Sequence, residues 1–401
     1  MKQSVARARD GGKAICLLPE ERVDVGVDVH KESYSVTVWS EARQQIVSHW
    51  VQPAIPGVLI RRLGAYDGHL RRVVYEAGPT GYGLVRALRR GGFEAEVIAP
   101  SRTPRRTGPA AKSDRLDSRQ LAMWSAKGLV QPVRAPTEVE EGDRQVFRLR
   151  QQLLAKRRRV KQQIKSFLLQ YGIAEPEGLA HWTKGSLEGL SRLRLRAPLR
   201  FALDLLLEEL AHCEGLFQRA DRAVRELAGQ RRHRQTARVL QTVPGVGAIT
   251  AMAVRTELLA PERFGNGREV AAMTGLAPLV MRSGGTVREG SLMRGGNTRL
   301  RTALIEAAWR WVAHDAGARE RYGHLLRTTG EPNKAIAAMA RRLIIILWRM
   351  SLTGEPYRPR CEGQPQAGQP GLNGQSPKGQ RAPSRPQEAD RRRPLSVQTP
   401  G

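Results

Sequence analysis

Cysteine is scarce in this chain, and so are aromatic side chains and long apolar runs. Its three cysteines, Cys16, Cys213 and Cys361, are too far apart for a zinc-binding spacing or a disulfide framework, so we expect a reducing cytoplasm. The longest apolar run, 343–348, is far too short to span a bilayer, and the N-terminus lacks the apolar stretch of a signal peptide. We therefore expect no membrane partner. Aromatics make up only 5% of the residues, which favours a helical protein with a charged surface.

Positive charge, in contrast, is abundant. Lys and Arg number 67 against 38 for Asp and Glu, which gives the 401 residues a formal net charge of +29. Self-repulsion on that scale predicts a polyanionic partner such as DNA or RNA. Arg outnumbers Lys, and its planar guanidinium suits bidentate contact with phosphate. A GC-rich genome would explain the preference for Arg over Lys, but it would not explain the excess of positive over negative charge.

The region 22–136 has the pattern of an α/β domain. Its first strand, 23–29, alternates valines with polar or small residues, which is the period-two signature of a half-buried strand. A three-strand meander followed by strand, helix, strand and helix is the layout of the ribonuclease H fold. The preceding residues, 1–21, are polar and basic and predict a loose leader. The full set of expected elements comprises strands at 23–29, 33–39, 45–50, 71–75 and 94–98, and helices at 56–66, 80–90 and 114–127.

Beyond residue 136 the strand patterns give way to helical ones. The region 137–235 predicts two long amphipathic helices separated by a linker at 172–198. Such helices are typical of a coiled-coil arm or dimer contact, and equally of a helical hairpin within one chain. The region 236–352 predicts a compact helical domain. Residues 353–401 are rich in Pro, Gly, Gln and Arg and predict a disordered basic tail.

Four acidic residues are the first candidates for chemistry. Asp28 ends the first strand, and Glu76 ends a later apolar strand just before Gly and Pro. Asp114 and Asp117 open the helix at 114–127 and share one helix face at a spacing of three. Each acid alone is usually structural, as a turn residue or a helix cap. Together they predict a site for Mg²⁺, because converging carboxylates are tolerated when divalent cations neutralise them, as in phosphoryl transfer.

A tight turn between two helices is the second candidate. The segment 240–251 predicts a helix, a turn at Pro244-Gly245-Val246-Gly247, and a second helix starting at Ala248. Backbone amides of Gly245 and Gly247 at a helix N-terminus can approach a DNA phosphate closely, as in a helix-hairpin-helix. An ordinary helix turn has the same pattern, so both interpretations stay open.

A glycine-rich basic segment around Ser283 is the third candidate. A serine in such a loop is a candidate nucleophile on phosphorus, with nearby arginines stabilising the negative charge that develops. The residues alone favour a simpler interpretation, a basic loop that binds backbone phosphate. The residues of this segment expected to contact nucleic acid are Arg282, Gly284, Gly285, Arg288, Arg294, Asn297 and Arg299.

The order of these parts over 22–350 resembles the DEDD transposases of the insertion-sequence 110/1111 group, relatives of the Piv DNA invertase. The resemblance implies a RuvC-like ribonuclease H domain whose Mg²⁺ ligands are Asp28, Glu76, Asp114 and Asp117. It implies a coiled-coil arm and a C-terminal transposase domain in which Ser283 forms a covalent link to DNA. It further implies a bridge RNA that pairs with donor and target DNA, assembly as dimers or tetramers, and a bacterial, nucleoid-associated location. The tail at 353–401 is longer than this family leads us to expect.

Two other functions fit part of the same pattern. A Holliday-junction resolvase or other structure-specific nuclease would use the four acids with water as the nucleophile and would not need Ser283. A non-catalytic nucleic-acid-binding protein would need only the net charge and the helix-hairpin-helix. Mg²⁺-dependent strand cleavage separates the first from the second, and a covalent protein–DNA adduct separates both from a recombinase.

Overall fold

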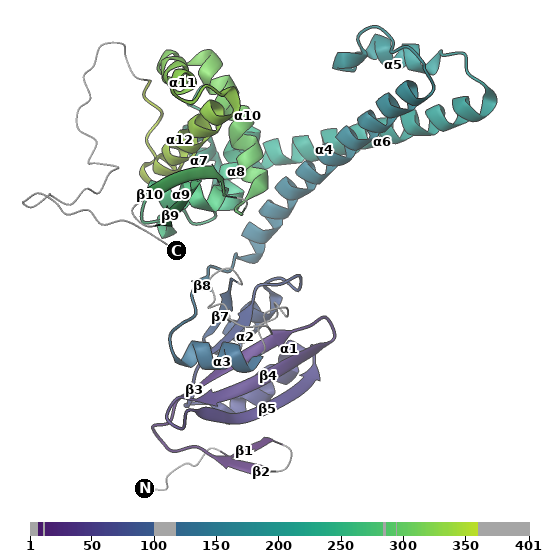
Figure 1. Cartoon of the computed structure of the whole chain (residues 1–401). Helices are drawn as coiled ribbons and strands as arrows, with labels where there is room; N and C mark the ends of the chain where they lie inside the picture. The colour runs from purple at the N-terminus through teal and green to yellow at the C-terminus, as the bar shows by residue number, and fades with distance from the viewer. Residues whose placement is uncertain (1–6, 11–12, 100–117, 284–285, 294, 360–401) are drawn as a thin grey trace, which may run out of the picture.

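A computed structural model describes residues 7–10, 13–99, 118–283, 286–293 and 295–359. The chain forms a sheet domain, a long helical arm and a helical C-terminal domain (Figure 1). Residues 360–401, expected to form a tail, lie outside the described residues. None of the described helices is long and apolar enough to cross a membrane.

The N-terminal domain is built on a six-stranded mixed sheet with the order β5-β4-β3-β6-β7-β8. The three-strand meander is confirmed, with β4 antiparallel to both β3 and β5. The strands β6 and β7 continue the sheet parallel to β3, and the short β8 is antiparallel to β7. The strand bounds are β3 Val23–Val29, β4 Ser33–Ser40, β5 Gln45–Pro53, β6 Leu70–Glu76, β7 Ala95–Ile98 and β8 Pro132–Val133.

Helices cover both faces of this sheet. On one face lie α1 (Pro56–Leu63), which continues as the 3₁₀ turn η1 (Gly64–Tyr66), and α2 (Gly83–Arg90). Their buried leucines pack against the valines of β3 in one apolar cluster. On the other face lies α3 (Ser118–Ala126), whose Leu121 and Trp124 pack with Val74 of β6 and Ile98 of β7. Helices on the two sides thus bury both faces of the sheet at its centre.

The segment expected to be a loose leader instead carries structure. The strands β1 (Arg7–Asp10) and β2 (Lys13–Cys16) form an antiparallel hairpin. The side chain of Leu17, only 4% exposed, joins the core of the sheet domain. Glu21 is also buried and accepts hydrogen bonds from Ser40 and Arg43. Leu17 and Glu21 therefore tie the segment that follows the hairpin to the sheet domain, and the polar composition of 1–21 gave no signal for either contact.

The arm is a helical hairpin within one chain. The helices α4 (Glu138–Gln170) and α6 (Ala197–Gly229) pack side by side, with ion pairs Arg150–Asp221 and Arg157–Glu214 between them. The expected linker contains the 3₁₀ turn η3 (Leu179–His181) and the helix α5 (Lys184–Ser191). Leu179 and Leu190 are fully buried at the tip of the arm against both long helices. That burial gives the linker its structure.

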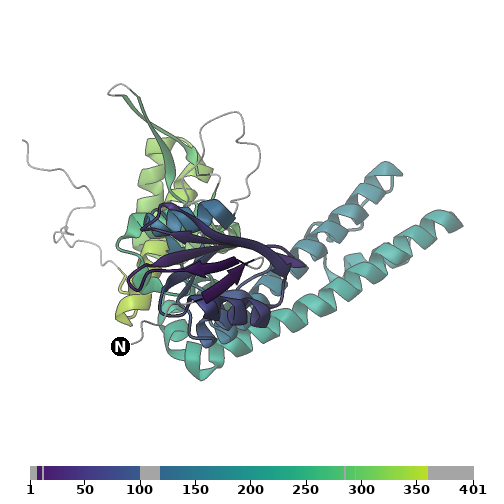
Figure 2. The ribbon, with the colours of Figure 1, turned by 90° about the horizontal axis from the view of Figure 1, so that it is seen from below.

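The C-terminal domain is mainly helical, as expected, and has one apolar core. It also contains an antiparallel hairpin that the sequence patterns missed, formed by β9 (Pro278–Ser283) and β10 (Thr286–Leu292). This hairpin projects from the helices (Figure 2). The helices are α7 Arg231–Leu240, α8 Ala248–Leu258, η4 Pro261–Arg263, α9 Gly267–Thr274, α10 Thr298–His314, α11 Ala316–Thr329 and α12 Pro332–Thr353.

Candidate functional site

Asp28 and Glu76 lie next to each other at one edge of the sheet. Strands β3 and β6 run parallel with Val27 opposite Tyr75, so the next residues on the two strands are Asp28 and Glu76. Val27 and Tyr75 both belong to the core beneath α1 and α2. Because side chains alternate along a strand, Asp28 and Glu76 lie on the opposite face, which α3 covers. Two carboxylates that are 48 positions apart in the sequence therefore meet at the carboxyl ends of neighbouring strands.

The first residue of α3 packs on the same face, beside Asp28. A Cβ added to Gly26 would lie 2.1 Å from the carbonyl oxygen of Ser118, so α3 touches the sheet where β3 has no side chain. The Ser118 hydroxyl contacts Thr37 Oγ1 at 2.9 Å and Ser35 Oγ at 3.2 Å. Ser35 is the cross-strand neighbour of Asp28 on β4. The start of α3 thus lies against Gly26, which is two positions before Asp28 on β3.

The other two predicted acids, Asp114 and Asp117, lie outside the described residues. Among the residues that the structure does describe, no group of three or more His, Cys, Asp or Glu side chains is arranged to hold a metal ion. One further side chain reaches the acidic edge, because His30 Nε2 lies 3.0 Å from Asp28 Oδ2. The sequence patterns missed His30, although it follows Asp28 by only two positions. The described structure therefore brings two of the four predicted acids together and adds a histidine.

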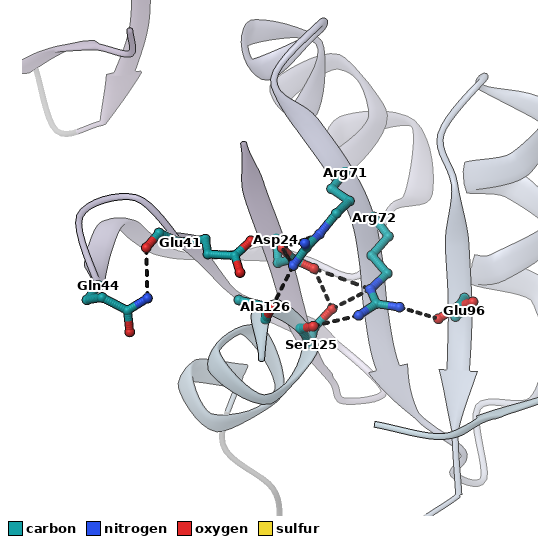
Figure 3. A network of polar contacts seen from close by, with 8 residues as sticks. All are labelled: Asp24, Glu41, Gln44, Arg71, Arg72, Glu96, Ser125 and Ala126. Atoms are coloured by element: carbon teal, nitrogen blue, oxygen red, sulfur yellow. Dashed lines mark hydrogen bonds and ion pairs between the residues drawn. The ribbon is translucent and has the colours of Figure 1, made fainter. Parts of the chain in front are cut away.

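A second acid on β3, Asp24, holds the other end of α3 (Figure 3). Its side chain is completely buried and accepts bonds from Arg71 Nη2 at 2.7 Å and Ser125 Oγ at 2.6 Å. Arg72 Nε lies 3.3 Å away. The same two arginines donate to the last carbonyls of α3, Arg71 to Ala126 and Arg72 to Ser125. These cations complement the carboxyl end of a helix dipole. The sequence patterns did not predict this cluster, although Asp24, Gly26 and Asp28 share one strand face.

Ser283 lies in the β9–β10 hairpin and not in an irregular loop. It is the last residue of β9 and pairs with Thr286, while Arg282 pairs with Val287 and Arg288 with Met281. The structure therefore places the backbone of Ser283 at the outer end of the hairpin. Gly284, Gly285 and Arg294 lie outside the described residues.

The base of this hairpin is tightly packed against α9 and α10. Gly275 has a φ of +70° and Gly296 a φ of +95°, and a Cβ on Gly296 would lie 2.5 Å from the Gly275 nitrogen. Such close backbone contact requires glycine. Asn297, which remains a predicted nucleic-acid contact, also has hydrogen-bond partners within the chain. Its Oδ1 caps α10 by accepting from Leu300 N at 3.1 Å, and its Nδ2 donates to Glu257 at 2.7 Å.

Glu257 connects the hairpin base to the arm. Its carboxylate, on a residue only 3% exposed, receives two bonds from Arg148 of α4 at 2.8 and 2.9 Å. Burial alone would raise the pKa of Glu257, but the bonds from Arg148 and Asn297 outweigh it and hold this pKa below its usual value. The group therefore stays ionised at neutral pH, as a buried link between α4, α8 and the start of α10.

The turn between α7 and α8 has the expected helix–turn–helix order, and Gly245 in this turn is partly buried against α10. Its φ is +84°, and an added Cβ would lie 2.7 Å from the backbone nitrogen of Trp311 in α10. Gly247 precedes α8 with nothing within 4 Å of an added Cβ, and Arg299 is exposed on α10. Packing against α10 explains why a glycine stands at 245, and phosphate contact by Pro244, Gly245 and Gly247 at this turn remains a prediction.

Both candidate parts fall within segments that match transposase families. Residues 25–173 match the DEDD transposase model of the IS110 type, and residues 237–323 match the model for the IS116/IS110/IS902 transposase family. A Sinorhizobium fredii protein named as transposase y4qE is 31% identical over 303 residues, which are 75% of this chain and 74% of that protein. The transposase for insertion sequence element IS1328 of Yersinia enterocolitica is 25% identical over 278 residues, covering 68% and 81% of the two chains. The IS1111A transposase of Coxiella burnetii is 22% identical over 341 residues, covering 83% and 91%.

Proposed function

Because this chain belongs to the IS116/IS110/IS902 family of transposases, we propose that it cuts and rejoins DNA at a composite site of four carboxylates and Ser283. The observation that carries the proposal is the meeting of Asp28 and Glu76 at the ends of two neighbouring parallel strands. Both are on the face that α3 covers, and the buried Asp24 on the same face is already paired with Arg71 and Arg72.

The donor set suits a hard divalent cation. One peptide bond joins Asp117 to Ser118, so their Cα atoms are about 3.8 Å apart wherever the preceding segment runs. Since Ser118 is fixed beside Asp28, this covalent limit supports Asp117, and with it Asp114 three residues earlier in the sequence, as partners of Asp28 and Glu76. We assign these four side chains as the Mg²⁺ ligands, because carboxylate oxygens are what Mg²⁺ prefers. When bound, the ion would neutralise the acids and the negative charge on the scissile phosphate.

Ser283 is the proposed nucleophile. Its Oγ would attack the scissile phosphorus, forming a serine–phosphate ester while the bond from phosphorus to the leaving sugar oxygen breaks. The serine proton would pass to Asp117 or another of the acids, and the leaving sugar oxygen would take up a proton. Attack by the sugar hydroxyl of another strand on the same phosphorus would then release the serine and rejoin the DNA. Arg282, Arg288, Arg294 and Arg299 would stabilise the developing charge.

The strand order supports a ribonuclease H or RuvC-like assignment for the N-terminal domain, since an antiparallel meander here leads into parallel strands. The net charge of +29 supports binding of donor DNA, target DNA and a guiding bridge RNA. Exposed apolar side chains at the arm, Leu169 at 83% and Phe201 at 67%, support a dimer or tetramer with the arm as a coiled-coil contact.

The test is to incubate the full chain with its co-purifying RNA, Mg²⁺ and a cleavable DNA, and to look for a covalent protein–DNA adduct. Ser283→Ala should abolish the adduct, whereas Ser291→Ala, a serine on β10, should retain it. Asp28→Asn should abolish strand cleavage, whereas Asp67→Asn, an exposed turn residue, should not.

Three outcomes separate the alternatives. Cleavage that survives Ser283→Ala but not Asp28→Asn would make water the nucleophile, as in a resolvase. Binding without any cleavage would leave a nucleic-acid-binding protein. An adduct formed by Ser283→Ala at the normal level would remove this serine from the mechanism.

A further inference from the structure

The C-terminal domain contains a cavity of about 580 Å³ whose lining includes none of the candidate site residues described above. It lies between α10, α11 and α12, and the segment 355–358 after α12 forms one wall. This volume falls in the range of about 300 to 1,000 Å³ that holds small ligands. The cavity is thus large enough for a ligand with a ring system and a charged group.

Aromatic and apolar side chains line the inside. Trp311 and Trp348 are almost fully buried, and Tyr357 stands edge-on to Trp311 with 6.3 Å between ring centroids. Their polar atoms are already used, because Trp311 Nε1 donates to Tyr357 and Trp348 Nε1 donates to the carbonyl of Pro261. The two buried tryptophans therefore form the floor of the cavity, and Tyr357, which is only partly buried, is the aromatic ring that a ligand in the cavity can reach.

Positive charge dominates the rest of the lining. Four arginines line the cavity, against two acids, Asp315 and Glu355. Asp315 is committed within the chain, since it caps α11 through Ala318 N at 2.7 Å and accepts from Tyr357 at 3.2 Å. The arginines are Arg321, Arg342, Arg349 and Arg358. The side chains of Arg321, Arg349 and Arg358 make no ion pair or hydrogen bond to any residue that the structure describes.

We propose that this cavity binds one nucleotide unit of a nucleic acid, with the base against the aromatic lining and the phosphate on the arginines. Stacking of a base on aromatic side chains and pairing of phosphate with guanidinium are the two contacts that such a lining provides. An acidic peptide would satisfy the arginines but would leave the ring surface without a flat partner. The proposal does not depend on the acidic edge or on Ser283.

The experiment crosslinks the full chain to single-stranded oligonucleotides that carry 4-thiothymidine, in EDTA so that no cleavage intervenes. Mass spectrometry locates the crosslinked residues, and fluorescence anisotropy of the same oligonucleotides gives the affinity. A crosslink is expected at Tyr357. Arg349→Gln and Arg321→Gln should each weaken this crosslink about tenfold, the usual effect of losing one charge-assisted hydrogen bond. The matched control is Arg327→Gln, an exposed arginine of α11 that does not line the cavity.

Competition identifies the class of ligand. Thymidine 5′-monophosphate should suppress the crosslink at Tyr357, while inorganic phosphate and polyglutamate at the same charge concentration should not. Equal suppression by inorganic phosphate would show a plain anion site and overturn the nucleotide assignment, as would suppression by polyglutamate alone. Crosslinks confined to other parts of the chain, or equal losses in Arg349→Gln and Arg327→Gln, would remove the cavity from nucleic-acid binding. Because the crosslinking is done in EDTA and measures binding without cleavage, none of these results depends on the proposed recombination chemistry.

Discussion

Replacing Asp24 by asparagine tests whether a buried charge holds α3 on the sheet. The substitution keeps the shape of the side chain but removes the negative charge that Arg71, Arg72 and Ser125 share. It also places an amide group against two guanidinium groups. The expected result is a less stable N-terminal domain, with the loss centred on the contact between β3 and α3.

The contacts set the size of the effect. Removing one partner of a buried ion pair costs about 3–5 kcal/mol, because the remaining charge stays buried without compensation. Here Asp24 is fully buried, but the side chains of Arg71 and Arg72 are 37% and 22% exposed. Each arginine also has a second acid within reach, Glu41 at 2.9 Å and Glu96 at 3.5 Å. Partial exposure and these second partners place the expected loss at the lower end, about 3 kcal/mol.

Urea unfolding of the full chain, followed by tryptophan fluorescence, measures this loss. With a slope of about 2 kcal/mol per molar urea, the midpoint of the N-terminal domain should fall by roughly 1.5 M. Trp124 on α3 is a local reporter. Glu41→Gln is the control, because its side chain is 48% exposed and an exposed pair contributes about 0.5 kcal/mol. If Asp24→Asn unfolds at the same urea midpoint as Glu41→Gln, the buried charge of Asp24 does not hold α3 on the sheet.

Three further predictions follow from the packing. Burial alone would raise the pKa of Glu257, but its bonds from Arg148 outweigh burial and lower this pKa. The ionised carboxylate therefore contributes its full share of the folding stability above the usual pKa of 4.5, and this share is lost as the pH falls through the lower pKa of the folded state. Glu257→Gln should therefore reduce stability at pH 7 and weaken its dependence on pH below 4.5 in acid unfolding; unchanged acid unfolding would contradict the link. Gly245→Ala should cost about 2 kcal/mol in thermal unfolding because of its positive φ and the nearby α10 backbone, whereas Gly247→Ala should cost little, and the reverse order would be inconsistent with this packing. Gly26→Ala should displace α3 and abolish DNA cleavage, since its Cβ would lie 2.1 Å from a backbone oxygen; normal cleavage would argue against a fixed α3.

Much of the N-terminal domain could be predicted from the sequence because its signals are local. Alternating valines predicted β3, and the change from strand to helix patterns predicted the order of the elements from β3 to β7 correctly but missed the short β8. The acids at strand ends were informative for the same reason. A carboxylate that follows an apolar strand is unusual, and parallel strands bring their carboxyl ends to one edge. That edge is where the structure places Asp28 and Glu76.

The elements that were missed depend on contacts with distant residues. The hairpins β1–β2 and β9–β10 have weak patterns, and the helix α5 forms in a segment that looks like a linker. For α5, partners elsewhere in the chain supply the stabilisation, as Leu190 shows in the arm, and Leu17, directly after β2, joins the sheet core. Propensity within a short window cannot register such burial.

The same limit applies to the roles of single residues. Asn297 sits among glycines and arginines and looks like a phosphate contact, but the fold pairs it with Glu257, 40 residues away. Gly245 looks like a phosphate-binding glycine, but α10 occupies the space beside it. Asp24 and Asp28 have the same pattern in the sequence, and only the tertiary structure separates them, burying one among arginines and leaving the other at the open edge.

The sequence by itself thus determined the net charge, the alternation that makes β3 a strand, and the presence of acids at strand ends. These properties follow from residue type and spacing, which the chain carries whether or not it is folded. The tertiary structure decided which acid is a structural partner, which glycine is closed by a neighbouring helix, and where the arginines of the C-terminal domain gather. Those outcomes depend on distances between residues far apart in the chain, and electrostatic and packing energies change steeply with such distances.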